Sequence, residues 1–413
     1  MKSTANRFVI GVAFIIAIGA VTPVSADYTA GMDAFKAKDY GTAADAFEAV
    51  IDAQPNEPAT HYMLGLCRRA QKNLSAALGS FRKAMELDSA NETPNPMYSI
   101  TLGQTLNQAK QYGEAYSTLK ALDFTKLPGN YRTTYALLFA KAANETDRAG
   151  EAVNVLNAQV RADTSNADLY QALGVAQDDL GDDKAAFSAF KRAYELDGDQ
   201  ISGRYAVRSA TAVARRSTSS TEKNRYYTDA ANISEALARA KPTLEHNLLT
   251  GESWLGAKQY SKALSWFEKA KAQSPQNALI HYYIGQSYTS LGQLSNALSS
   301  LQRALDLGSG NPDLRKKIYN QMGYVHEKNR DFMKAKQAYS EAGNRSKAAA
   351  MDQKEEAEAG NIIHEKECRE FKNKIDALAM QAEEFEKLGD IESARQMREQ
   401  LTVLQRQYAE TCR

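Results

Sequence analysis

The stretch THYMLGLCRRAQKNLSAALGSFRKAMELDSAN, residues 60–91, carries the pattern that decides the fold of this chain. It contains Gly65, a small residue twelve positions later, a bulky one four after that, and another small one three further on. The same skeleton recurs in DLYQALGVAQDDLGDDKAAFSAFKRAYELDGD (168–199) and in LIHYYIGQSYTSLGQLSNALSSLQRALDLGSGN (279–311). A skeleton that recurs along a chain predicts a repeat architecture, in which each unit is one supersecondary element.

Seven units align on this skeleton. Their glycines are Gly31, Gly65, Gly103, Gly174, Gly251, Gly285 and Gly323. The paired small residues are Ala43, Ala77, Ala115, Ala186, Ala263, Ala297 and Ala335. The large residues are Phe47, Phe81, Leu119, Phe190, Phe267, Leu301 and Tyr339. Two looser units fill the gaps, one marked by Ala140, Ala152 and Leu156 and the other by Ala230, Leu237 and Pro242.

This pattern resembles the tetratricopeptide repeat over roughly residues 28–343. The resemblance implies an all-α solenoid, a right-handed superhelix of helix-turn-helix repeats with an inner groove. Small residues at the crossing point let two antiparallel helices approach closely, and the large residue fills the space between hairpins. Two glycine intervals of 38 rather than 34, after Gly65 and after Gly285, predict connections that carry extra residues.

The predicted organisation is an N-terminal repeat array (27–200), a stretched unit (201–242), a second array (243–344) and a charged tail (345–413). We expect longer helices and a protruding turn in the stretched unit, or a slight break between two sub-arrays. In the tail, residues 345–363 are predicted to form a charged helix or linker. Beyond them, apolar residues spaced three and four apart from Phe371 to Tyr408 predict an antiparallel coiled-coil-like hairpin that turns at Gly389-Asp390.

The register of this hairpin brings Cys368 and Cys412 together at its open end. In an exported protein such a pair is more often oxidised than reduced, so we predict a disulfide, with two free thiols near frayed ends as the alternative. Cys67 lies inside a repeat helix and is interpreted as a core residue.

The first 26 residues are typical of a secretory signal peptide. Lys2 and Arg7 precede the apolar run at 8–21, and Val24-Ser25-Ala26 offers a cleavage site. The alternative is an uncleaved N-terminal anchor. We expect an exported protein, with the periplasm favoured over full secretion and no stable membrane insertion after cleavage. The net charge of +1 argues against nucleic acid as the main ligand.

No constellation of catalytic or metal-ligating residues stands out. The sequence has no HExxH, GxSxG, CxxC or phosphate-binding glycine loop. His61 and His281 share one repeat position, which favours packing over catalysis. We therefore predict a protein that is not an enzyme and that binds no cofactor or metal.

Binding is the remaining role, and the resemblance assigns it to the first helix of each repeat. We expect the groove to bind a peptide or an amphipathic helix of a partner protein. In the first array it is expected to be lined by Met32, Phe35, Tyr62, Leu66, Arg69, Ile100, Gln104, Asn107, Leu137 and Lys141. In the second array the expected lining residues are Tyr282, Gln286, Asn320 and Tyr324. Glu245, Leu248, Glu252 and Glu327 occupy equivalent positions, and the three glutamates make the second set more acidic. The alternative is that the groove residues support packing between repeats.

The stretched unit is locally basic. Between residues 201 and 228 there is one acidic residue, Glu222, and there are six basic residues: Arg204, Arg208, Arg215, Arg216, Lys223 and Arg225. This patch predicts either an anionic partner or a solvated surface.

We expect a non-catalytic adaptor for envelope proteins, whose tail hairpin could also pair between chains. The alternative is a scaffold for exopolysaccharide synthesis or export, or for secretion, that holds an anionic glycan or a synthase subunit.

Overall fold

The computed structural model describes residues 26–308 and 310–412. The predicted signal peptide therefore lies outside the described residues, except for Ala26, where the first helix begins. The chain divides into two compact units, one that ends at Pro242 and one that begins at Thr243. Within the described residues, no helix is long and apolar enough to cross a membrane.

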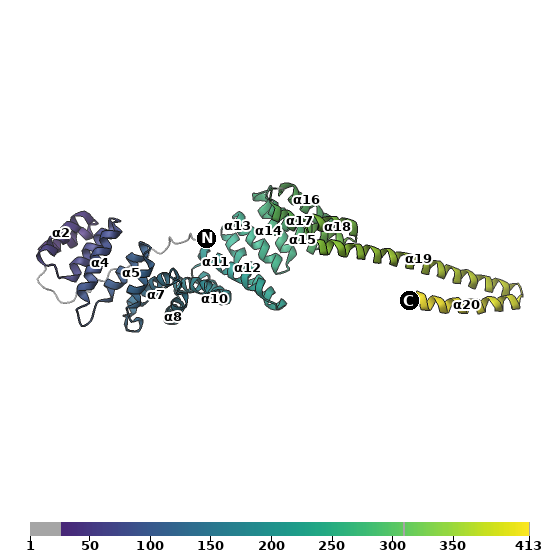
Figure 1. Ribbon diagram of the computed structural model, residues 1–413, viewed down its shortest axis with the longest axis horizontal. Coiled ribbons are helices and arrows are strands. Elements are labelled where there is room, and N and C mark those ends of the chain that lie inside the picture. The colour runs from purple at the N-terminus through teal and green to yellow at the C-terminus, as the bar shows by residue number, and fades with distance from the viewer. Residues whose placement is uncertain (1–25, 309, 413) are drawn as a thin grey trace. The chain divides into compact units, whose positions relative to one another are not determined.

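The N-terminal unit is a series of six helical hairpins in its described part, and each helix packs on the ones before and after it (Figure 1). In chain order its elements are α1 (Ala26–Lys36), α2 (Tyr40–Ala53), α3 (Pro58–Ala70), α4 (Leu74–Asp88), α5 (Pro96–Gln108), α6 (Tyr112–Lys120), the 3-10 turn η1 (Phe124–Lys126), α7 (Gly129–Asn144), α8 (Ala149–Ala162), α9 (Ala167–Asp179), α10 (Asp183–Asp197), α11 (Gln200–Arg216) and α12 (Ser220–Ala240).

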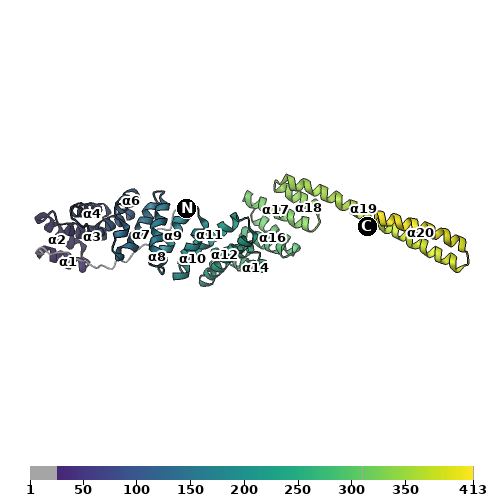
Figure 2. The same ribbon diagram turned by 90° about the horizontal axis from the view of Figure 1, so that it is seen from below.

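The C-terminal unit continues the hairpin pattern three more times and then changes it (Figure 2). Its helices are α13 (Leu244–Gly256), α14 (Tyr260–Gln273), α15 (Ala278–Ser290), α16 (Leu294–Leu307), α17 (Pro312–Lys328), α18 (Phe332–Glu341), α19 (Arg345–Lys387) and α20 (Ile391–Thr411). The predicted all-α solenoid of helical hairpins is confirmed.

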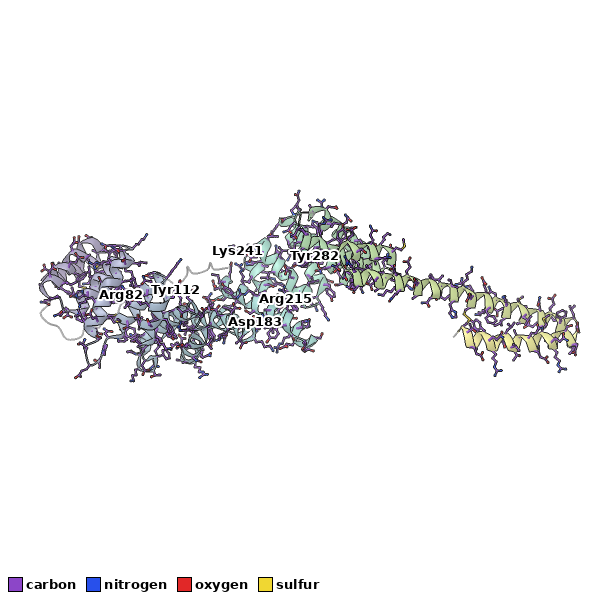
Figure 3. The ribbon with its side chains drawn as sticks, viewed as in Figure 1. Arg82, Tyr112, Asp183, Arg215, Lys241 and Tyr282 are labelled. Carbon is purple, nitrogen blue, oxygen red and sulfur yellow. A yellow bond between two sulfur atoms is a disulfide. The ribbon has the colours of Figure 1, made fainter. Side chains whose placement is uncertain are left out.

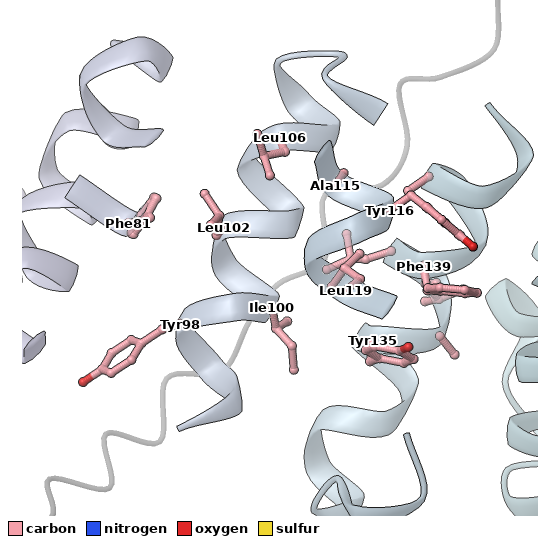
Figure 4. Close-up of a cluster of buried hydrophobic side chains, with 14 of the residues drawn as sticks. Phe81, Tyr98, Ile100, Leu102, Leu106, Ala115, Tyr116, Leu119, Tyr135 and Phe139 are labelled. Carbon is pink, nitrogen blue, oxygen red and sulfur yellow. The ribbon is translucent and has the colours of Figure 1, made fainter. Parts of the chain in front are cut away.

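The contact between each repeat glycine and the large residue sixteen positions later holds the hairpins together. A Cβ placed on Gly65 would lie 2.6 Å from Cε1 of Phe81, and one on Gly251 would lie 2.5 Å from Cε1 of Phe267. The same close approach occurs at all seven predicted glycines. Their partners, such as Phe81 and Leu119, are fully buried, and Figure 4 shows Leu119 of α6 packed between α5 and α7. The absence of a side chain at glycine is what lets the ring or isobutyl group settle on the helix backbone.

In every repeat hairpin of the described chain except α11–α12, the turn between the two helices places one residue in the left-handed region, seven positions after the repeat glycine or, in α7–α8, after Ala140. Glycine fills that position at Gly181 and Gly292, whereas Lys38, Lys72, Lys110, Asp147, Lys258 and Arg330 adopt it with a side chain, at φ of 58–64°. A left-handed residue commonly ends a helix, and glycine is the type that adopts this conformation without a steric penalty from Cβ.

Replacing Lys72 with glycine should therefore stabilise the N-terminal unit by about 1 kcal/mol, because the left-handed backbone costs an L-residue about that much. Lys72 is exposed, so no packing is lost. The matched control is Gly292→Ala, which should destabilise its own unit by a similar amount. Urea unfolding followed by circular dichroism measures both midpoints, and a lower midpoint for Lys72→Gly would contradict the expectation.

The two long glycine intervals have different structural origins. After Gly65, the extra residues lie in the connection between α4 and α5, as predicted. After Gly285, the prediction of a longer connection is wrong: α17 has 17 residues where α15 has 13, so the extra residues form one more helical turn. In the stretched unit, α11 and α12 have 17 and 21 residues, which confirms the expectation of longer helices there.

The regular packing ends at α18 and α19. Gly343 is left-handed and Ala348, five residues later, is buried, as in the seven aligned units. The positions that elsewhere hold glycine and its large partner are instead Lys336 and Asp352, whose side chains form an ion pair at 2.7 Å. A further hairpin does not pack on this face, because it would have to bury the ion pair. Repeat arrays end in this way, with a terminal repeat whose outer face is polar.

Beyond this point α19 continues and pairs with α20 as an antiparallel hairpin. The rings of Phe371 and Tyr408 meet at 6.0 Å, which agrees with the predicted register. Ile375, Ala382 and Ala394 are the residues buried between the two helices. A disulfide joins Cys368 to Cys412, the predicted pair, with their Cα atoms 5.7 Å apart.

Candidate docking face on the first helices

The structure separates the predicted groove residues into buried and accessible ones. Six of them are buried: Tyr62, Leu66, Ile100, Asn107, Leu137 and Tyr282. Their assignment to an open binding surface is corrected, because packing between successive hairpins uses their side chains. The ring of Tyr62 lies 5.1 Å from that of Tyr98, and its hydroxyl is hydrogen-bonded to Thr101. Asn107 donates from its amide to the carbonyl oxygen of Leu138 on α7.

The remaining predicted positions of the N-terminal unit are half-buried. These are Met32 and Phe35 on α1, Arg69 on α3, Gln104 on α5 and Lys141 on α7. All of them come from the first helix of a hairpin, and α5 and α7 contact one another directly. We call these five residues the docking face. It combines two apolar side chains, one amide and two cations.

Arg69 is the best-positioned group on this face. Its guanidinium lies 5.6 Å above the ring of Phe81 and donates to Oε1 of Gln104 at 3.1 Å and to Oγ1 of Thr105 at 3.4 Å. Both acceptors are neutral, and within the described part of the chain Arg69 forms no ion pair. Burial lowers the pKa of Arg69, but a guanidinium remains charged at neutral pH. A partly desolvated cation without a carboxylate partner is an energetic cost that an anionic ligand would relieve.

The predicted positions of the C-terminal unit are largely occupied by the chain itself. Asn320 accepts a hydrogen bond from the side chain of Asn344, the N-cap of α19, and Gln286 donates to the hydroxyl of Tyr282. Glu327 pairs with Lys354 of α19 and accepts a hydrogen bond from Tyr339 at 2.7 Å. Tyr324 is accessible, at 40 % exposed, and Glu245 is exposed as well. No apolar pattern in the sequence predicts this contact of α19 with α17, because ionic and amide groups make it.

The basic stretch is partly neutralised by neighbouring helices. Arg208 pairs with Asp178 of α9, and Arg216 pairs with Asp183 of α10, whereas Arg215 is exposed. Figure 3 labels Asp183 and Arg215. Glu222 pairs with Lys184 of α10 at 2.7 Å. The guanidinium of Arg225 lies over Tyr226 at 4.7 Å. The net positive charge of this stretch is smaller in the structure than in the sequence of residues 201–228, because Asp178 and Asp183 lie outside that range and pair with two of its arginines. Arg204 and Lys223, the other two predicted members, lie on α11 and α12.

The remaining polar residues have structural partners. Nε2 of His61 lies 2.8 Å from the carbonyl oxygen of Pro55, and His281 makes the same contact with Pro275. Their shared repeat position therefore corresponds to a shared role in the turn between hairpins. Burial raises the pKa of Cys67 to about 11, which keeps the thiol protonated and unreactive. Among the described residues, no cluster of three His, Cys, Asp or Glu side chains could hold a metal ion.

Comparison with known proteins agrees with the repeat assignment. Sequence models of the tetratricopeptide repeat match residues 28–92, 222–278 and 167–200. Superkiller protein 3 of Schizosaccharomyces pombe is 25 % identical over an alignment of 184 residues, and the match covers 42 % of this chain and 12 % of that protein. This chain therefore matches only a small part of that relative.

The solved structures that this chain resembles include the following two. One is a thermophilic TPR protein of Thermus thermophilus, with 17 % identity, a TM-score of 0.32, and coverage of 45 % of this chain and 97 % of that one. The other is pilF of Pseudomonas aeruginosa, with 17 % identity, a TM-score of 0.41, and coverage of 55 % and 96 %. The family matches support the tetratricopeptide repeat, whose members are in general non-catalytic scaffolds for protein–protein interaction.

Proposed function

We propose that this chain uses its tetratricopeptide repeats as a non-catalytic adaptor of the cell envelope, and that the docking face of the N-terminal unit holds a peptide or helix of a partner protein. The observation that carries this proposal is the half-buried Arg69, held by Gln104 and Thr105 without a carboxylate partner in the described residues. Met32 and Phe35 of α1, half-buried and packed against the core, add apolar side chains on another first helix of the same unit. A partner segment with apolar residues and one acidic side chain fits these groups.

The envelope location is part of the proposal and rests on the sequence of residues 1–26. The alternative of a scaffold that binds an anionic glycan at the basic stretch has less support, because Asp178 and Asp183 pair with two of its arginines. A protein partner at the docking face is therefore the function that we favour.

Arg69→Ala should weaken partner binding at least about tenfold, the effect of losing one charge-assisted contact in a partly desolvated site. Affinity capture with residues 27–413 from an envelope extract identifies the partner, and calorimetry then measures its Kd. Arg161→Ala is the matched control, since Arg161 is exposed on the second helix α8. Arg69→Lys, which keeps the charge but loses the planar fork, should recover part of the affinity. Equal Kd values for the wild type and Arg69→Ala would contradict the proposal.

A further inference from the structure

The middle of α19 has no neighbour within the described chain. At its start α19 packs on α18 through Ala348 and Met351, and farther along it the ion pair of Glu358 with Arg330, in the turn before α18, has an N–O distance of 2.8 Å. The hairpin with α20 begins only at the Cys368–Cys412 disulfide. Figures 1 and 2 both show the intervening turns of α19 running without an adjacent helix. We call residues 359–367 the bare segment.

The bare segment exposes apolar surface that has no structural role in this unit. Ile362 is 60 % exposed and Ile363 is 59 % exposed, side by side on a helix that is otherwise rich in charge. Gly360 precedes them, and a Cβ placed there would meet nothing within 4 Å. Glycine inside a helix lowers its stability, and here no close packing within the chain compensates. Glycine beside two isoleucines does, however, permit the close approach of a second helix.

The charge around the bare segment identifies the kind of helix that fits. Between residues 355 and 370 the sequence has six glutamates against Lys366 and Arg369, a net charge of −4. Of these glutamates only Glu358 forms an ion pair within the described residues. A second copy of this chain would bring the same negative charge against itself, and an anionic membrane surface would be repelled as well. A cationic surface is the complement.

We propose that the bare segment is a second docking site, for a cationic amphipathic helix of a partner protein whose apolar face covers Ile362 and Ile363. The partner's lysines or arginines would pair with Glu365 and Glu367, which flank the two isoleucines around the helix, and with Glu355 two turns earlier. This helix-on-helix mode differs from the docking face, which lies in the other unit and offers cations. A result that disproves binding at the bare segment would therefore not disprove binding at the docking face.

The test uses residues 27–413 and a fluorescein-labelled, 18-residue helical peptide of lysine and leucine with its leucines on one face. Fluorescence anisotropy gives its Kd, and an isomer with the leucines scrambled reports purely ionic binding. The double variant Ile362→Ser/Ile363→Ser should weaken the amphipathic peptide at least about tenfold. Glu365→Gln/Glu367→Gln should weaken it in a salt-dependent way. Both pairs are exposed, so the melting midpoint should not change.

The matched control is Met380→Ser/Val403→Ser, which removes exposed apolar residues from the paired part of the hairpin. It should bind the peptide like the wild type. Equal affinity of the isoleucine variant and the wild type, or equal binding of both peptides, would overturn the proposal. So would sedimentation equilibrium showing a wild-type dimer that the isoleucine variant abolishes, because the occupant would then be a second copy.

Discussion

Phe81→Ala should lower the free energy of unfolding of the N-terminal unit by about 3–5 kcal/mol, among the largest effects of any single change in this chain. The ring of Phe81 is fully buried, lies against Gly65 and also contacts the ring of Tyr62 at 5.7 Å and the guanidinium of Arg69. Removing it leaves a cavity between two hairpins and also frees Arg69 from its aromatic support. Because repeats stabilise one another through nearest-neighbour interfaces, α3 to α6 should lose protection first.

A double-mutant cycle isolates the contact between the two residues. Gly65→Ala alone should cost about 1–3 kcal/mol, because its methyl group would lie 2.6 Å from the ring of Phe81. In the Phe81→Ala background the same substitution should be nearly neutral, since the space is open. The matched control is Gly79→Ala on α4, where a Cβ meets nothing within 4 Å, and it should be neutral or slightly stabilising. Additive effects of Gly65→Ala and Phe81→Ala in chemical denaturation would contradict the contact.

The second large effect is expected at the tail. Cys368→Ser/Cys412→Ser should destabilise the α19–α20 hairpin by about 2–4 kcal/mol, because the disulfide closes a long loop, with a sequence separation of 44. Among the described residues, those buried in this hairpin are Ile375, Ala382 and Ala394, so its apolar core is small. Hydrogen exchange of the α20 amides should accelerate about a hundredfold, while α15 and α16 remain unchanged.

Reductant provides the internal control for this prediction. It should reproduce the faster exchange in the wild type and have no further effect on the serine variant. Unchanged protection of α20 in both cases would show that packing alone holds the hairpin.

The fold followed from the sequence because one local rule repeats. Gly65 and Phe81 are sixteen residues apart in a single hairpin, so their contact depends only on nearby sequence. The tail register was equally local: Phe371 and Tyr408 face one another because both helices leave the same turn. Such contacts are fixed by periodicity and by one connection length.

The docking face was predictable only in part. The offset from glycine identifies the side of the first helix, but it does not tell whether the next hairpin uses that side chain. Tyr62 is buried because Tyr98 lies beside it, and Asn107 because Leu138 presents a carbonyl oxygen. The start of α19 covers Asn320 and Glu327 through Asn344 and Lys354, polar contacts that have no period. The ion pairs of Arg208 with Asp178 and of Arg216 with Asp183 also follow no period in the sequence.

The central claim, that a partner protein binds the first helices of the N-terminal unit, is tested most directly by photocrosslinking in the intact cell. A benzophenone amino acid at Gln104, half-buried on α5, should yield a discrete adduct with one protein, and Arg69→Ala should remove that adduct. The same group at Arg161 on α8 should yield none. An adduct from position 161 alone, or an adduct at 104 that Arg69→Ala leaves unchanged, would contradict the account.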